Sequence, residues 1–169
     1  MESKETNCRC VGCGAVVPDI DAPTHAYIGA SPGCWSVYCD VLGREYGPLR
    51  NPPWHRFTVD AYAAQHPGVE SRRSVQSVTV HLLALHLLLD RGLEPGYVTR
   101  RLGSAVKISS EFHWLTPPSF ARCPTVLDVA ATVSPEDHER AVKRWASGVW
   151  RAWACHHAAV IDLASRIEV

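Results

Sequence analysis

Two cysteines near the start of the chain, Cys10 and Cys13, have the spacing of a metal-binding knuckle. Thiolates three positions apart on a tight turn can both point at one ion, and Gly14 after the second lets the backbone turn there. Thiolates favour zinc, which takes four ligands in a closed tetrahedral site. The spacing therefore predicts zinc at Cys10 and Cys13, with two more ligands from elsewhere in the chain.

Cys34 is the best candidate for the third ligand. It follows Ser31 and Pro32, a typical helix start, and therefore lies in a first turn where the helix dipole favours a thiolate. Cys39 cannot join it easily, because five residues turn a helix by about 500°, which leaves the two side chains about 140° apart. The candidates for the fourth ligand are Cys8, His25, His66 and His81.

A catalytic metal site is the alternative interpretation. The chain has nine histidines, and histidines from separate helices can meet in a core and leave one coordination position open for water, as in a metal-dependent transferase or hydrolase. The histidines considered for this site are His66, His81, His156 and His157. His55 and Asp60 can join a metal or acid–base site, or can be purely structural, and the sequence leaves their role open.

Two other functions of the knuckle are disfavoured. A nucleic-acid-binding zinc knuckle normally lies in a basic chain, whereas this chain has 17 basic and 17 acidic residues and no basic run beside Cys10. A redox pair normally follows a strand and begins a helix. No strand is predicted before Cys10, and Gly12 and Gly14 oppose a helix.

The composition predicts a soluble, cytoplasmic protein. The first six residues are polar and charged, unlike a secretory signal, and the longest apolar run, 78–89, is too short to span a bilayer. Seven cysteines without an export signal favour metal ligands and free thiols over disulfides. The expected partner is a small molecule or a protein, with no nucleic acid and no membrane, and the oligomeric state is not predicted.

The hydrophobic pattern predicts a mainly α fold in which these residues must be positioned. We expect a metal-knuckle segment without regular structure over 1–30, followed by a single helical domain of about five helices over 31–169. Strong patterns predict helices at 31–46, 59–65, 71–91 and 134–167, and weaker patterns favour helices at 97–106 and 125–132. Thr58 is the expected N-cap of the second helix.

Several segments together resemble an uncharacterised bacterial family of small proteins, a domain of unknown function. These segments are CVGCGA at 10–15, YIGASPGCW at 27–35, HRFTVDAYAAQHPG at 55–68, QSVTVHL at 76–82 and WASGVWRAW at 145–153 with His156 and His157 after it. The resemblance covers most of the chain and implies no activity, but it indicates which segments form the site. The resemblance includes both His66 and His81, and we predict His66 as the fourth ligand, with His81 as the second choice.

Overall fold

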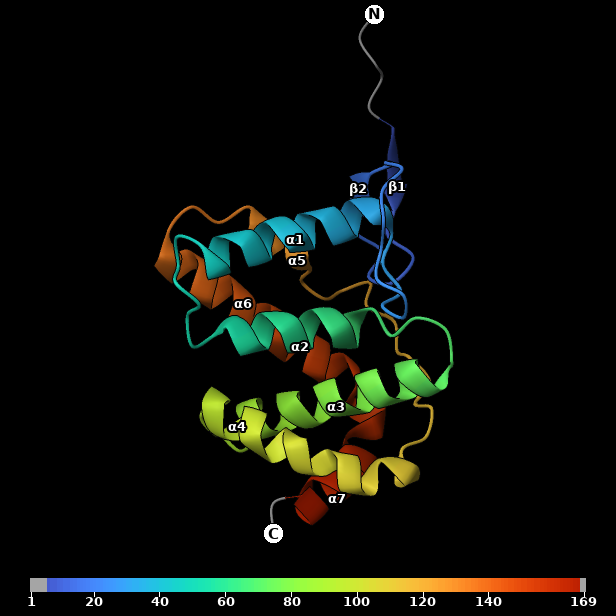
Figure 1. Ribbon diagram of the computed structural model, residues 1–169. Coiled ribbons are helices and arrows are strands. Elements are labelled where there is room, and N and C mark those ends of the chain that lie inside the picture. The colour runs from blue at the N-terminus through green and yellow to red at the C-terminus, as the bar shows by residue number, and fades with distance from the viewer. Residues whose placement is uncertain (1–5, 168–169) are drawn as a thin grey trace, which may run out of the picture.

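Helices account for most of residues 6–167, the part of the chain that the computed structural model describes. Figure 1 shows α1 (Pro32–Tyr46), α2 (His55–Gln65) and α3 (Arg72–Leu89) one beneath another, with the N-terminal strands at one end of α1. The remaining helices are α4 (Pro95–Leu102), the 3-10 helix η1 (Gly103–Glu111), α5 (Val126–Ala130), α6 (Pro135–Ala152), the 3-10 helix η2 (Ala154–His156) and α7 (His157–Ile167). The predicted mainly α fold is confirmed.

Helix α6 and Trp153 after it hold the C-terminal end of α2 in place. Helix α6 packs against α2, α3 and α5, and two tryptophan rings, Trp145 in α6 and Trp153 just after it, are fully buried. The indole Nε1 of Trp145 donates to Oε1 of Gln65 at 2.8 Å, and the indole of Trp153, just after α6, donates to the carbonyl of Ala64 at 3.0 Å. Buried indole N–H groups need such acceptors. The last turn of α2 is therefore held rigidly, which matters for the residue that follows it.

Several helix boundaries follow from local sequence signals. Ser71 caps α3 by accepting a hydrogen bond from the N–H of Ser74, and Ser134 caps α6 by accepting one from Asp137. Helix α2 begins at His55, earlier than the predicted start at residue 59. Thr58 does not cap it, because its hydroxyl is buried and donates to Glu45.

The predicted continuous last helix is wrong. The chain leaves α6 at Trp153, passes through η2 and begins α7 at His157. The imidazole Nε2 of His157 lies 2.9 Å from the carbonyl oxygen of Trp150, and its ring stacks on the Trp150 ring. Both helices bury apolar side chains in the same core, so the apolar spacing continues across the break and hides it in the sequence.

The N-terminal segment also differs from the prediction. Residues predicted to lack regular structure form a two-stranded antiparallel sheet of β1 (Asn7–Arg9) and β2 (Val16–Pro18), in which Cys8 pairs with Val17. Val17 is buried, and β2 contacts α1. The turn between the two strands carries the CxxC knuckle.

None of the helices within residues 6–167 combines the length and the apolar character needed to cross a membrane.

Candidate metal centre

Four side chains from three separate parts of the fold converge at one buried point. Their sulfur and nitrogen ligand atoms all lie within 4.8 Å of one another, and all four residues are buried. The residues are Cys10, Cys13, Cys34 and His66, which we call the Cys3His cluster. Among residues 6–167 this is the one group of three or more metal-binding side chains with such spacing.

Two of the distances between the ligand atoms match those of a tetrahedral ion. The Sγ atoms of Cys13 and Cys34 lie 3.9 Å apart, and Cys34 Sγ lies 3.5 Å from Nε2 of His66. Zinc with Zn–S bonds of about 2.3 Å and a Zn–N bond of about 2.0 Å places two sulfurs about 3.8 Å apart and a sulfur and a nitrogen about 3.5 Å apart. The cluster can therefore hold a metal ion of this size with little rearrangement.

The β1–β2 turn positions the thiols of Cys10 and Cys13. The N–H of Cys10 donates to the carbonyl of Ala15, and the N–H of Gly14 donates to the carbonyl of Cys10, with Gly14 at a φ of 76°. Ser31, the residue before α1, donates its backbone N–H to Cys10 Sγ at 3.5 Å, and its hydroxyl accepts from the N–H of Val11. The knuckle is thereby docked on the start of α1, whose first turn supplies Cys34.

His66 is oriented by its second nitrogen. It follows the last residue of α2, and its Nδ1 lies 2.7 Å from the carbonyl oxygen of Tyr62, to which Nδ1–H donates. This hydrogen bond fixes the tautomer and leaves Nε2 to face the sulfurs, as in most metal-binding histidines. Since α6 holds the end of α2, the imidazole has a fixed position in the core.

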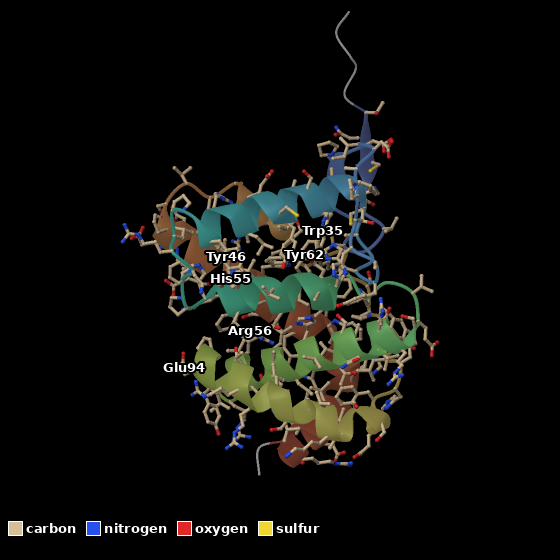
Figure 2. The ribbon with its side chains drawn as sticks, viewed as in Figure 1. Trp35, Tyr46, His55, Arg56, Tyr62 and Glu94 are labelled. Atoms are coloured by element: carbon tan, nitrogen blue, oxygen red, sulfur yellow. The ribbon has the colours of Figure 1, made fainter. Side chains whose placement is uncertain are left out.

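The Tyr62 ring covers the cluster. Its hydroxyl donates to Cys34 Sγ at 3.6 Å, its ring stacks on Tyr38, and it contacts the His66 ring. Trp35 packs against the Tyr62 ring, and Figure 2 shows Trp35 and Tyr62 together between α1 and α2. Burial and the neighbouring Cys34 raise the pKa of Tyr62, so the hydroxyl stays protonated as a donor to sulfur.

The electrostatics of the cluster favour a thiolate at Cys10 and a proton on His66. Hydrogen bonds from the thiols of Cys13 and Cys34 hold the pKa of Cys10 far below its usual range, and the same sharing of protons raises the pKa of Cys34. Burial acts to lower the pKa of His66, but hydrogen bonds with Cys10 and Cys13 outweigh it and raise this pKa to about 9. A site that stabilises a thiolate and attracts a proton is suited to a cation.

Gly12 provides a local test of this packing. A Cβ atom there would lie 2.5 Å from Cδ2 of His66 and 2.5 Å from the carbonyl oxygen of Gly29. We expect Gly12→Ala to lower the free energy of unfolding by about 1–3 kcal/mol through overpacking, measured by urea denaturation. Gly43→Ala is the matched control, because Gly43 lies within α1 with nothing within 4 Å of the added methyl group. It should stabilise the protein by about 0.5–1 kcal/mol, and equal effects of the two changes would contradict this packing.

The other candidate ligands lie outside the cluster. Nδ1 of His81 is 2.7 Å from Oδ1 of Asp60, Cys8 lies on β1, and His25 packs against Tyr27 and Trp35. Nε2 of His156 is 2.9 Å from the carbonyl oxygen of Thr116, and His157 is engaged by the carbonyl of Trp150. The structure does not bring His81, His156 and His157 together with His66.

A second buried polar group was not predicted as a unit. Glu45, in the last turn of α1, has no exposed surface. Its Oε1 lies 2.8 Å from Nε2 of His138 and accepts a hydrogen bond from the Thr58 hydroxyl. Its Oε2 lies 2.5 Å from Nδ1 of His55. Figure 2 shows His55 beside Tyr46, whose hydroxyl contacts the other imidazole nitrogen. His138, near the start of α6, is buried and makes its contact with Glu45.

Asp60 is likewise buried for a tertiary reason. The expected helix over 59–65 puts Asp60 in a first turn, but Asp60 lies in the middle of α2. There Oδ2 accepts from Nε of Arg56 at 2.7 Å, and Oδ1 contacts Nδ1 of His81. These contacts join α2 to α3.

A family of unknown function, DUF5946, matches residues 8–154, a range that includes the whole Cys3His cluster. Searches of curated proteins and of solved structures found no match to this chain.

Proposed function

Since the chain belongs to the DUF5946 family, whose function is unknown, we propose a function from the metal centre itself: the protein binds one zinc ion in the Cys3His cluster, and this ion fastens the N-terminal hairpin to the helical domain. The observation that carries the proposal is the convergence of three sulfurs and one imidazole nitrogen, all buried and all within 4.8 Å of one another.

The donor set supports zinc. Three thiolates and one imidazole form one of the common structural zinc sites, whereas calcium and magnesium prefer oxygen ligands. Four protein ligands fill the tetrahedron and leave no position for water, which favours a structural ion over a catalytic one. A catalytic site would need an open position, and the further histidines considered for it are engaged elsewhere.

The position of the ligands supports a fastening role. Two ligands come from the hairpin turn, one from the first turn of α1 and one from the end of α2. An ion at their centre would join three segments that are distant in sequence, and metal binding at such sites supplies folding free energy. In this proposal the helical domain is the part of the protein that binds a small-molecule or protein partner.

Elemental analysis with X-ray absorption at the metal edge tests the proposal. Protein purified without chelator should contain about one zinc per chain, coordinated by three sulfurs and one nitrogen. Protein without metal would overturn the proposal, and a nitrogen-rich site with bound water would favour the metalloenzyme instead.

Cys10→Ser should reduce the bound zinc to a small fraction of one ion per chain, because a serine hydroxyl is a poor zinc ligand. Cys8→Ser is the matched control: Cys8 lies two residues earlier in the same hairpin but outside the cluster, so this variant should keep its zinc. Full zinc content in the Cys10 variant would show that the ion binds elsewhere.

A further inference from the structure

The imidazole of His81 is hydrogen-bonded to a buried carboxylate, that of Asp60. Its Nδ1 lies 2.7 Å from Oδ1 of Asp60, which has no exposed surface, and the other oxygen of Asp60 accepts from Arg56 at 2.7 Å. In Figure 2 the Arg56 side chain lies between α2 and α3. A carboxylate that accepts from Nδ1–H fixes the orientation of the ring, and in the imidazolium form the Nε2–H is left to donate to a ligand. Within residues 6–167 no hydrogen bond joins this Nε2 to another group.

His81 faces a groove lined almost entirely by hydrogen-bond donors. The groove has a volume of about 460 Å³ and is lined by Tyr27, Arg73, Gln76, Ser77, Val80 and His81. A guanidinium, an amide, two hydroxyls and an imidazole are present, and no carboxylate lines it. Arg73 is exposed and forms no ion pair with the other described residues. Its positive charge is therefore not neutralised by the protein in the groove.

The spacing along α3 places these donors on one face. Arg73, Ser77 and His81 are separated by four residues each, so their side chains lie above one another on the helix, and Gln76 lies beside them. A larger hollow beside α5 and α6 differs, because Asp128 and Asp137 line it together with basic residues. The α3 groove is thus suited to an anion.

We propose that the α3 groove binds a small oxyanion, a phosphate or carboxylate group, between the guanidinium of Arg73 and the Nε2–H of the His81 imidazolium, with Gln76 and Ser77 donating further hydrogen bonds. Asp60 is a positioning residue that holds the imidazole in place. The binding groups all come from α3, so the site does not depend on the metal proposal. Arginine suits this role, since its planar group can give two parallel hydrogen bonds to an oxyanion.

An NMR titration of the purified full-length protein tests the proposal. Inorganic phosphate and acetate are added in separate experiments at constant ionic strength, and the His81 ring resonances and the Arg73 side-chain Nε–H are followed. Saturable shifts of both residues are expected with at least one probe, and the probe that saturates at the lower concentration identifies the preferred group. The absence of saturable shifts with either probe would overturn the proposal.

Adjacent arginines provide the matched control. Arg73→Gln should weaken binding by about tenfold or more, because a charge-assisted contact is lost. Arg72→Gln should change the affinity by less than about twofold, since Arg72 lines the neighbouring groove with Ser109 and Ser110. Equal weakening by both changes would indicate only general attraction by positive charge and would contradict a specific site.

His81→Gln should also weaken binding, and an unchanged amide spectrum away from α3 together with unchanged metal content would show that the fold is intact. If this variant were unfolded, the paired arginine variants would still decide the question, because both arginines are exposed.

Discussion

Cys34→Ser is expected to release the metal and to lower the melting temperature by roughly 6–12 °C. Cys34 has no exposed surface and contacts Cys13, His66 and Tyr62, so it connects the hairpin to both α1 and α2. Loss of a metal ligand is among the few changes that cost a domain about 3 kcal/mol or more. For a chain of this size, each 1 kcal/mol corresponds to about 2–4 °C.

Cys39→Ser is the control for this change, since Cys39 lies on the same helix but is exposed. It should keep both its zinc and its melting temperature, measured by calorimetry and elemental analysis. A Cys34 variant that melted like wild-type protein would show that the ion, if bound, does not stabilise the fold.

Removal of the ion from wild-type protein should have a localised effect. The hairpin contacts the helical domain mainly through the knuckle, Ser31 and the side of β2, so a strong chelator should loosen β1 and β2 first. Trypsin should then cleave after Arg9, at the end of β1, and added zinc should restore protection. Protection that is unaffected by chelation would contradict a fastening role.

The sequence was sufficient for the parts of the cluster that depend on local geometry. Cys10 and Cys13 are identifiable from their spacing, and Cys34 from the Ser31-Pro32 helix start. His66 is different, because its position depends on α6 holding the end of α2. We predict it from the segment in which it lies, and no local pattern separates it from His81, which contacts Asp60 outside the cluster.

The buried charges could not be derived from the sequence, because burial depends on which helices meet. Glu45 and Asp60 look like ordinary polar residues of amphipathic helices. One signal was available: Glu45 falls in the last turn of α1, where the helix dipole disfavours a carboxylate. A negative charge in that position indicates a compensating tertiary partner, and here His138 comes from a helix that begins 90 residues later.

Glu45→Ala is expected to lower the free energy of unfolding by about 3–5 kcal/mol, because removing one partner leaves buried donors without an acceptor. The affected donors are on His55, Thr58 and His138. Glu139→Ala is the control, since among residues 6–167 Glu139 pairs with Lys143 alone, on the surface of α6, and its loss should cost less than about 0.5 kcal/mol. Equal effects in urea denaturation would contradict a stabilising role for the Glu45 contacts.

Glu45 should also make the free energy of unfolding depend on pH. Burial acts to raise the pKa of Glu45, but hydrogen bonds from His138, His55 and Thr58 outweigh it and hold the pKa below its ordinary value of 4.5. A carboxyl whose pKa is lower in the folded state stabilises the fold above the unfolded-state pKa, and this stabilisation is lost as the pH falls through the folded-state pKa. Wild-type protein should therefore lose its advantage in free energy of unfolding over Glu45→Gln as the pH falls below about 4.5.

Acid also releases zinc by protonating its ligands. Both proteins keep the same Cys3His cluster, so the difference between their free energies of unfolding isolates the effect of Glu45. A difference that stays constant from pH 7 into this acid range would show that the charge of Glu45 contributes nothing to the fold.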